Sequence, residues 1–345
     1  MDKKHTSYSR RQFIKNSAIG LAGSVVPAIT GCVNVKTVKS KPTVVLVKHS
    51  KAIDASGKVQ QPIVEEMVNK ALTTFTGKRT VEDAWRMYIT PEDVIGLKIS
   101  TLGLMSVAGT EYVAHYSAVT SAIQGGLNKA KVQDKNIIIW DRSDEELVNA
   151  GFTIQKEPEA VRVFGTNLTR SEEGIGYSSE SYPVGTLQSR VTKIVTDITS
   201  VMINIPALKT HRLAGVTGAL KCHYGTIDNP GSMHENNCTN PGIAEINTIP
   251  IIRKKQKLII ADALLGLYEG GPWWQPGNIW PYGGILVATD PVAIDAVMLN
   301  ILDAKRKEES LPPMKDIAHN LLLSEQLGIG TSSLDAINLV EIVMG

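Results

Sequence analysis

The residues most able to do chemistry in this chain follow short runs of valine and isoleucine. The most informative stretch reads Asn204-Ile205-Pro206-Ala207-Leu208-Lys209-Thr210-His211, and Gly215-Val216-Thr217-Gly218-Ala219-Leu220-Lys221 follows shortly after it. An apolar run leads here to a basic cluster and then to a glycine-bounded turn, which we expect to open a helix. Free backbone N–H groups at such a turn, with lysines beside them, form an anion site.

We therefore assign Lys209 and His211 as candidate catalytic residues. An imidazole that titrates near neutrality suits His211 as a metal ligand or as a general base, although a lone loop histidine is more often neither. The candidate residues for binding the anion or substrate are Lys98, Asp141, Thr217, Gly218 and Lys221.

A set of carboxylates in the last third of the chain offers oxygen ligands for a divalent cation. The candidate metal ligands are Asp262, Glu269, Asp290 and Asp295. Asp290 precedes Pro291, so capping of the next helix is an equally good role for it. Asp295 lies in an apolar helix turn, where a buried carboxylate costs free energy unless it meets a partner.

Cysteine usage and missing motifs narrow the chemistry further. Cys222-His223 and His234-x-x-x-Cys238 superficially suit zinc or an iron–sulfur centre, but the paired Cys-x-x-Cys spacing is missing. A divalent metal is therefore favoured over an iron–sulfur cluster, with the cofactor itself left unknown. One Cys222–Cys238 disulfide is compatible with the sequence, and two unpaired structural thiols are the plainer interpretation. The chain has no Gly-x-Ser-x-Gly, His-Glu-x-x-His or Gly-x-Gly-x-x-Gly motif, which removes the common hydrolase, protease and dinucleotide interpretations.

The elements that must position these residues alternate between apolar runs and helical periodicity, a pattern typical of βαβ units. We predict strands over Thr43 to Val47, Val94 to Ile99, Asn136 to Trp140, Val201 to Ile205, Lys257 to Ala261 and Gly284 to Ala288. We predict helices over Gln61 to Phe75, Tyr112 to Ala130 and Pro291 to Leu302. The predicted fold is a doubly wound α/β fold with a largely parallel sheet and helices on both faces.

In such a sheet, ligands bind outside the carboxyl ends of the strands. Nearly every predicted strand delivers an ionisable side chain to that rim, so we expect one shared site there. The segments 167–190 and 228–242 lack periodicity and are expected to be surface excursions. The segment 266–283 holds three tryptophans with Gly-Gly-Pro, which favours a lid.

The first 31 residues have the layout of a signal peptide. Ser9-Arg10-Arg11-Gln12-Phe13-Ile14-Lys15 matches the twin-arginine consensus, and the apolar stretch after it is too short to span a bilayer. The stretch ends in Ile29-Thr30-Gly31-Cys32, the pattern of a lipoprotein cleavage site, so we predict lipidation at Cys32. Passengers of this route fold before export and often carry a cofactor with them.

These signals give a signal peptide at 1–31, a lipid-anchored tether at 32–41 and a single α/β domain at 42–345. The protein is expected to be exported to the periplasmic or cell-surface side and held in the membrane by its lipid. Its expected partners are the twin-arginine translocase during export, the membrane and a small anionic molecule. A net charge of +2, with 43% hydrophobic and 20% charged residues, argues against a nucleic-acid partner.

At the same residues the chain resembles a large bacterial and archaeal family known as domain of unknown function 362. The resemblance covers nearly all of the mature part, and its most specific signatures are Leu208-Lys209-Thr210-His211 and Asp290-Pro291-Val292-Ala293-Ile294-Asp295. The family often has asparagine in place of Ser100 and Cys222. Some relatives are fused to ferredoxin-like cysteine repeats, which implies redox chemistry with a cluster that a partner would supply here.

The leading hypothesis is a lipid-anchored enzyme that binds a divalent metal and a small anionic substrate at the rim of the sheet. The alternative is a non-catalytic protein that binds or assembles a cofactor or metal for an envelope redox enzyme. A third option is a structural envelope lipoprotein, in which the rim would be filled by Lys–Asp pairs and apolar packing.

Overall fold

The computed structural model describes residues 40–167, 174–240 and 242–345, and residues 41–345 form one compact unit. The predicted mixed α/β fold is confirmed. The strands are β1 (Thr43–His49), β2 (Ile95–Ile99), β3 (Ile137–Trp140), β4 (Arg162–Val163), β5 (Tyr177–Val184), β6 (Leu187–Thr192), β7 (Val201–Ile205), β8 (Ala207–His211), β9 (Gly215–Val216), β10 (Gln256–Leu267), β11 (Ile279–Ala288) and β12 (Asn338–Met344).

The three predicted helices are present as α2, α4 and α9; the bounds of the first two match closely, whereas α9 continues past its predicted end at Leu302 to Glu308. The helices are α2 (Gln61–Thr76), α3 (Val81–Trp85), α4 (Ala114–Lys129), α5 (Asp144–Asn149), α6 (Gly218–Cys222), α7 (Ile243–Ile246), α8 (Pro250–Lys255), α9 (Pro291–Glu308) and α10 (His319–Gln326). Pro291 occupies the first turn of α9, where its missing N–H costs nothing.

The central sheet has the strand order β12-β1-β11-β10-β7-β2-β3-β4, and β8 and β9 extend it beside β10. Most neighbouring strands run parallel, as predicted. Strand β11 runs antiparallel to both β1 and β10, and the short β9 runs antiparallel to β8. A β10–β11 connection without a crossover helix explains the direction of β11, since antiparallel neighbours can be joined directly.

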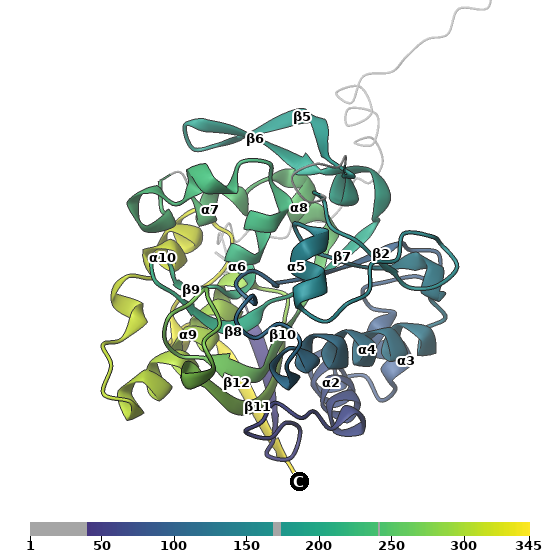
Figure 1. The fold of residues 1–345 in the computed structure, drawn as a ribbon, viewed down its shortest axis with the longest axis horizontal. Helices are drawn as coiled ribbons and strands as arrows, with labels where there is room; N and C mark the ends of the chain where they lie inside the picture. The colour runs from purple at the N-terminus through teal and green to yellow at the C-terminus, as the bar shows by residue number, and fades with distance from the viewer. Residues whose placement is uncertain (1–39, 168–173, 241) are drawn as a thin grey trace, which may run out of the picture. The chain divides into compact units, whose positions relative to one another are not determined.

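Both faces of the sheet are covered (Figure 1). Alternate residues of β1, β3 and β7 enter two different apolar clusters, as the period of two requires. One cluster packs the sheet against α2, α3 and α4, and the other packs it against α6, α8 and α9. In β2, for example, Ile95, Leu97 and Ile99 enter the first cluster, so Lys98 points to the opposite face.

The length of β10 allows it to pair with the strand that carries Lys209 and His211. This strand runs far beyond its predicted end at Ala261, to Leu267. Its first part pairs with β7 and its second part pairs with β8. Lys209 and His211 therefore lie on a strand instead of in a loop, just beyond the carboxyl ends of β2, β3 and β7.

The two segments predicted as surface excursions differ from each other in structure. Segment 167–190 includes β5, which pairs with β6 as a hairpin, whereas the described residues of 228–242 include two short 3-10 helices, Pro230–Met233 and Glu235–Cys238. The connection between β10 and β11, residues 268–278, carries Trp273 and Trp274. Within the described residues, no helix has both the length and the apolar character needed to cross a bilayer. The predicted signal peptide and Cys32 lie outside the described residues.

Candidate functional site

A cavity of about 140 Å³ lies where the ends of β2 and β3 meet β8 and α6. It brings together six of the residues predicted for the site, which come from widely separated parts of the sequence. They are Lys98, Asp141, Lys209, His211, Thr217 and Lys221. Gly218 and the four predicted metal ligands are not among the residues that line it.

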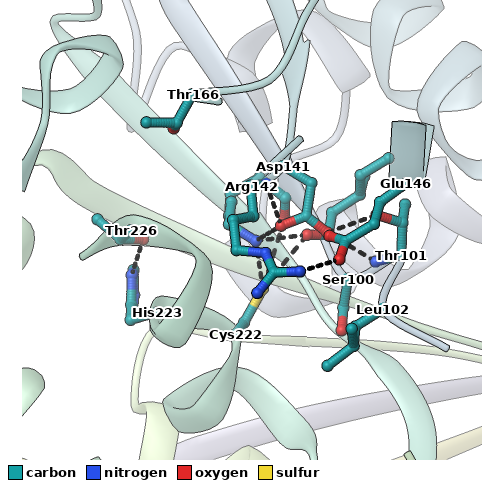
Figure 2. A network of polar contacts seen from close by, with 12 residues as sticks. Ser100, Thr101, Leu102, Asp141, Arg142, Glu146, Thr166, Cys222, His223 and Thr226 are labelled. Atoms are coloured by element: carbon teal, nitrogen blue, oxygen red, sulfur yellow. Dashed lines mark hydrogen bonds and ion pairs between the residues drawn. The ribbon is translucent and has the colours of Figure 1, made fainter. Parts of the chain in front are cut away.

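A buried ion pair lines the cavity, and Figure 2 shows its carboxylate, Asp141, beside Thr101. Lys98 Nζ lies 2.6 Å from Asp141 Oδ1, and both side chains are almost fully buried. Asp141 Oδ2 accepts hydrogen bonds from the Thr101 backbone N–H and hydroxyl, at 2.7 and 2.6 Å. Burial alone would lower the pKa of Lys98, but the Asp141 carboxylate outweighs it and the pKa is raised. Burial would raise the pKa of Asp141, yet Lys98 and Thr101 hold it below its usual value.

A second ion pair lies nearer the mouth of the cavity. The Arg142 guanidinium binds Glu146 one turn further along the chain, and the Arg142 side chain is 40% exposed. Burial is the main cause that raises the pKa of Glu146, with the nearby Asp141 charge acting in the same direction. Both carboxylates that line the cavity are therefore already bound to a cation of the chain.

Lys209 and Lys221 differ from these pairs, because neither lies within salt-bridge distance of a described carboxylate. Lys209 is fully buried, and its Nζ donates to the Leu102 carbonyl at 2.8 Å. Lys221 is 6% exposed, with its Nζ 3.3 Å from His234 Nε2 and 3.4 Å from the centre of the Tyr224 ring. Burial lowers the pKa of each lysine to about 8.

The surroundings of His211 fix which of its nitrogens carries the proton. Nδ1 accepts the backbone N–H groups of Leu213 and Ala214, both at 3.2 Å. The proton of the neutral ring must therefore reside on Nε2. Burial, with Lys221 adding to it, lowers the pKa of His211 to about 2. The ring is thus a neutral hydrogen-bond donor, which fits neither the expected general base nor a metal ligand through Nε2.

The turn before α6 does not provide the expected anion site for a ligand, because the chain's own Asp295 occupies it. The Asp295 carboxylate accepts the backbone N–H groups of Ala219 and Leu220. A Cβ at Gly218 would lie 2.3 Å from an Asp295 oxygen, so this close approach requires glycine. Burial raises the pKa of Asp295 to about 7. Thr217 lines the cavity, but Gly218 serves the contact with Asp295.

The other three predicted metal ligands also have partners of their own. Asp262 binds His115 Nδ1 at 2.6 Å inside the core, and Glu269 binds Arg306. Asp290 accepts the N–H groups of Val292 and Ala293 and so caps α9. No three His, Cys, Asp or Glu side chains of the described chain gather to hold a metal ion. The expectation of one shared cation site is corrected accordingly, because the strands and α9 deliver these carboxylates to different places.

The two cysteines in the described part of the chain are unpaired and buried. Cys222 lines the cavity, with its Sγ 3.5 Å from Lys98 Nζ. Burial raises the pKa of its thiol to about 11. Cys238 packs in the second apolar cluster. This agrees with two separate structural thiols and not with a disulfide or an iron–sulfur site.

Several cavity residues were missed from the sequence. They are Arg142, Glu146, Tyr224, His234 and Pro272. Tyr224 and His234 belong to the stretch after α6, much of which we expected to be a surface excursion. The sequence feature that could have indicated His234 is the pair of histidines near Lys221, His223 and His234, which we considered only as metal ligands. Pro272 belongs to the tryptophan-rich connection, so that segment does contact the site, as a lid would.

Similarity to known proteins identifies the family of the chain. No curated protein matches the chain. A crystal structure of a protein from Thermotoga maritima is similar at 11% sequence identity, with a TM-score of 0.39, over 78% of this chain and 59% of that one. The chain thus spans less than two thirds of that protein's length. The family model described as "Domain of unknown function (DUF362)" matches residues 102–300, more than half of the sequence and most of the cavity, so the chain belongs to this family.

Proposed function

We propose that the chain binds a small anionic molecule in the cavity beside β8 and α6. One observation carries this proposal: Lys209 and Lys221 are buried and line the same cavity, and no described carboxylate lies within salt-bridge distance of either of them. A buried charge is costly unless an opposite charge meets it. A bound anion would supply the missing charge.

The proposed roles follow from the hydrogen-bonding state of each group. Lys209 and Lys221 bind the anion as charged donors, and His211 donates Nε2–H to it as a neutral ring. Lys98 and Asp141 act together as the wall that holds Thr101 and the following loop in place. We therefore do not assign Lys98 the direct contact with the anion that the sequence suggested, because the Asp141 carboxylate already balances the charge of Lys98.

The cavity is compatible with an enzyme and with a binding protein. The enzyme hypothesis is favoured by Lys209, because burial brings its pKa to about 8 and so close to the pH at which proton transfer is efficient. Lys209 would then give a proton to, or take one from, the bound molecule. The alternative, a non-catalytic binding or assembly protein, needs only the anion contacts.

We expect that replacing Lys221 by methionine weakens phosphate binding by about 10–100-fold, since a charge-assisted hydrogen bond is worth about 1.5–3 kcal/mol. Isothermal titration of the whole protein with inorganic phosphate measures this. Lys135→Met is the matched control, because Lys135 is exposed and does not line the cavity. If wild-type protein bound none of phosphate, sulfate, malonate and acetate, the proposal would be wrong.

The cellular location of the protein is a separate part of the proposal. The twin-arginine motif and the Cys32 pattern support export and lipid anchoring. We expect wild-type protein to incorporate labelled fatty acid and to sediment with membranes, and we expect Cys32→Ala to do neither. Equal labelling of both proteins would contradict lipidation at Cys32.

A further inference from the structure

The balance of charge within the cavity indicates how many negative charges the bound anion carries. Four cationic side chains line it, namely Lys98, Arg142, Lys209 and Lys221, with two carboxylates, Asp141 and Glu146. Each carboxylate is bound to one cation, Asp141 to Lys98 and Glu146 to Arg142. Two ammonium groups are therefore left without a carboxylate among the described residues.

The groups that do contact these two lysines are all neutral. Lys209 donates to a backbone carbonyl, and Lys221 lies against His234 and the face of the Tyr224 ring. His234 Nδ1 lies 3.3 Å from the Gly231 carbonyl, so its proton resides there and Nε2 accepts from Lys221. Each ammonium has three N–H groups, so donors remain for a ligand.

Two unbalanced ammonium groups in one small cavity repel each other, and the burial of both side chains limits the screening that water provides at the surface. A singly charged anion would balance only one of them. We infer that the ligand bears two negative charges as an oxyanion, in the form of a phosphate group or a pair of carboxylates on a short chain. This inference rests on the proposed function and specifies its ligand.

The size and the layout of the donors agree with such a ligand. A cavity of about 140 Å³ is small and suits a molecule of few non-hydrogen atoms. Lys209 and His211 come from β8, whereas Lys221 comes from α6. Donors from separate elements can bind different oxygen atoms of one ligand, as a doubly charged oxyanion requires.

Calorimetric titrations of the whole protein at pH 7 and constant ionic strength test this directly. The probes are sulfate and malonate as dianions, inorganic phosphate as a mixture of its monoanion and dianion, and acetate as the monoanion. We expect at least one dianion to bind about 10–100-fold more tightly than acetate. A preference for sulfate and phosphate would indicate a phosphate-like ligand, and a preference for malonate would indicate a dicarboxylate.

Variants that remove one cation make the test independent of ligand shape. Lys209→Met and Lys221→Met should each weaken dianion binding by about 10-fold or more and leave acetate binding within about threefold. Lys221→Gln, which keeps a polar group, should behave like Lys221→Met, and circular dichroism checks that each variant folds. Above pH 8, wild-type affinity for sulfate should fall with the loss of two protons, and that of each variant with the loss of one.

The outcomes separate the two proposals. Equal affinities for acetate and for all dianions would overturn the inference of a doubly charged ligand while leaving anion binding intact. The absence of binding for every probe would overturn the proposed function as well. Retention of the dianion preference in both methionine variants would also contradict the inference, since it would show that the lysines are not its source.

Discussion

Replacing Asp141 by alanine is expected to lower the free energy of unfolding by about 3–5 kcal/mol, because it leaves the Lys98 ammonium buried and unpaired. Lys98 is 1% exposed and Asp141 is 4% exposed, so water cannot replace the lost contact. The substitution also removes the acceptor of the Thr101 backbone N–H and hydroxyl. Urea unfolding followed by circular dichroism measures the loss.

Two further variants isolate the cause. Glu65→Ala breaks the Lys129–Glu65 pair, whose atoms lie 2.9 Å apart but whose side chains are 48% and 43% exposed. This surface pair should cost about 1 kcal/mol or less. The double variant Lys98→Met, Asp141→Leu should recover much of the stability lost in Asp141→Ala, because it leaves no buried charge. An equal loss in Asp141→Ala and in Glu65→Ala would contradict the role of burial.

The pH dependence of this pair has a definite sign. The pKa of Asp141 is lower in the folded chain than in the unfolded chain. The contribution of its carboxylate is therefore present above the unfolded pKa, about 3.9, and is lost as the pH falls below it. Wild-type stability should decline more steeply on acidification than that of the double variant.

Much of the fold could be predicted from the sequence because burial on both faces leaves long runs of valine and isoleucine. The predicted strand from Val201 to Ile205 and the predicted helix from Gln61 to Phe75 are examples. The true length of β10 could not be predicted, since Asp262 interrupts its apolar run. Only the structure shows that this aspartate is bound to His115 within the core.

The residues of the candidate site could likewise be predicted only in part from the sequence. The rule that ligands bind beyond the carboxyl ends of parallel strands was enough to group Lys98, Asp141 and Lys209. The carboxylates could not be assigned in this way, because their roles depend on partners distant in sequence. Asp295, for instance, meets backbone groups 75 and 76 residues away. Residue type alone does not distinguish such an internal partner from a metal ligand.

The connection between β10 and β11 supplies one residue of the cavity wall and one residue that packs near Lys209. Pro272 lines the cavity directly. Trp274 is fully buried, with its ring centre 6.0 Å from Lys209 Nζ and 5.6 Å from the His115 ring centre. The Trp274 backbone N–H donates to the Gly103 carbonyl at 2.9 Å, and the Ser106 hydroxyl donates to the Trp274 backbone carbonyl. The connection is thus held against the loop that also supplies Leu102, the partner of Lys209.

Trp274→Ala is therefore expected to lower the free energy of unfolding by about 3–5 kcal/mol, the usual cost of removing a buried tryptophan side chain. It should also weaken sulfate binding, because Lys209 loses the wall that holds it. Urea unfolding and calorimetry measure the two effects. The adjacent Trp273 is 48% exposed, so Trp273→Ala should cost about 1 kcal/mol or less and leave sulfate binding unchanged.

A third variant separates packing from hydrogen bonding. Trp274 Nε1 has no hydrogen-bond partner among the described residues, so Trp274→Phe removes volume but no bond. It should retain most of the sulfate affinity that Trp274→Ala loses. If Trp273→Ala and Trp274→Ala were equally harmful, packing at position 274 would not explain the effect. If Trp274→Ala lost stability but bound sulfate normally, the connection would support the fold without shaping the cavity, and Lys209 would be held by Leu102 alone.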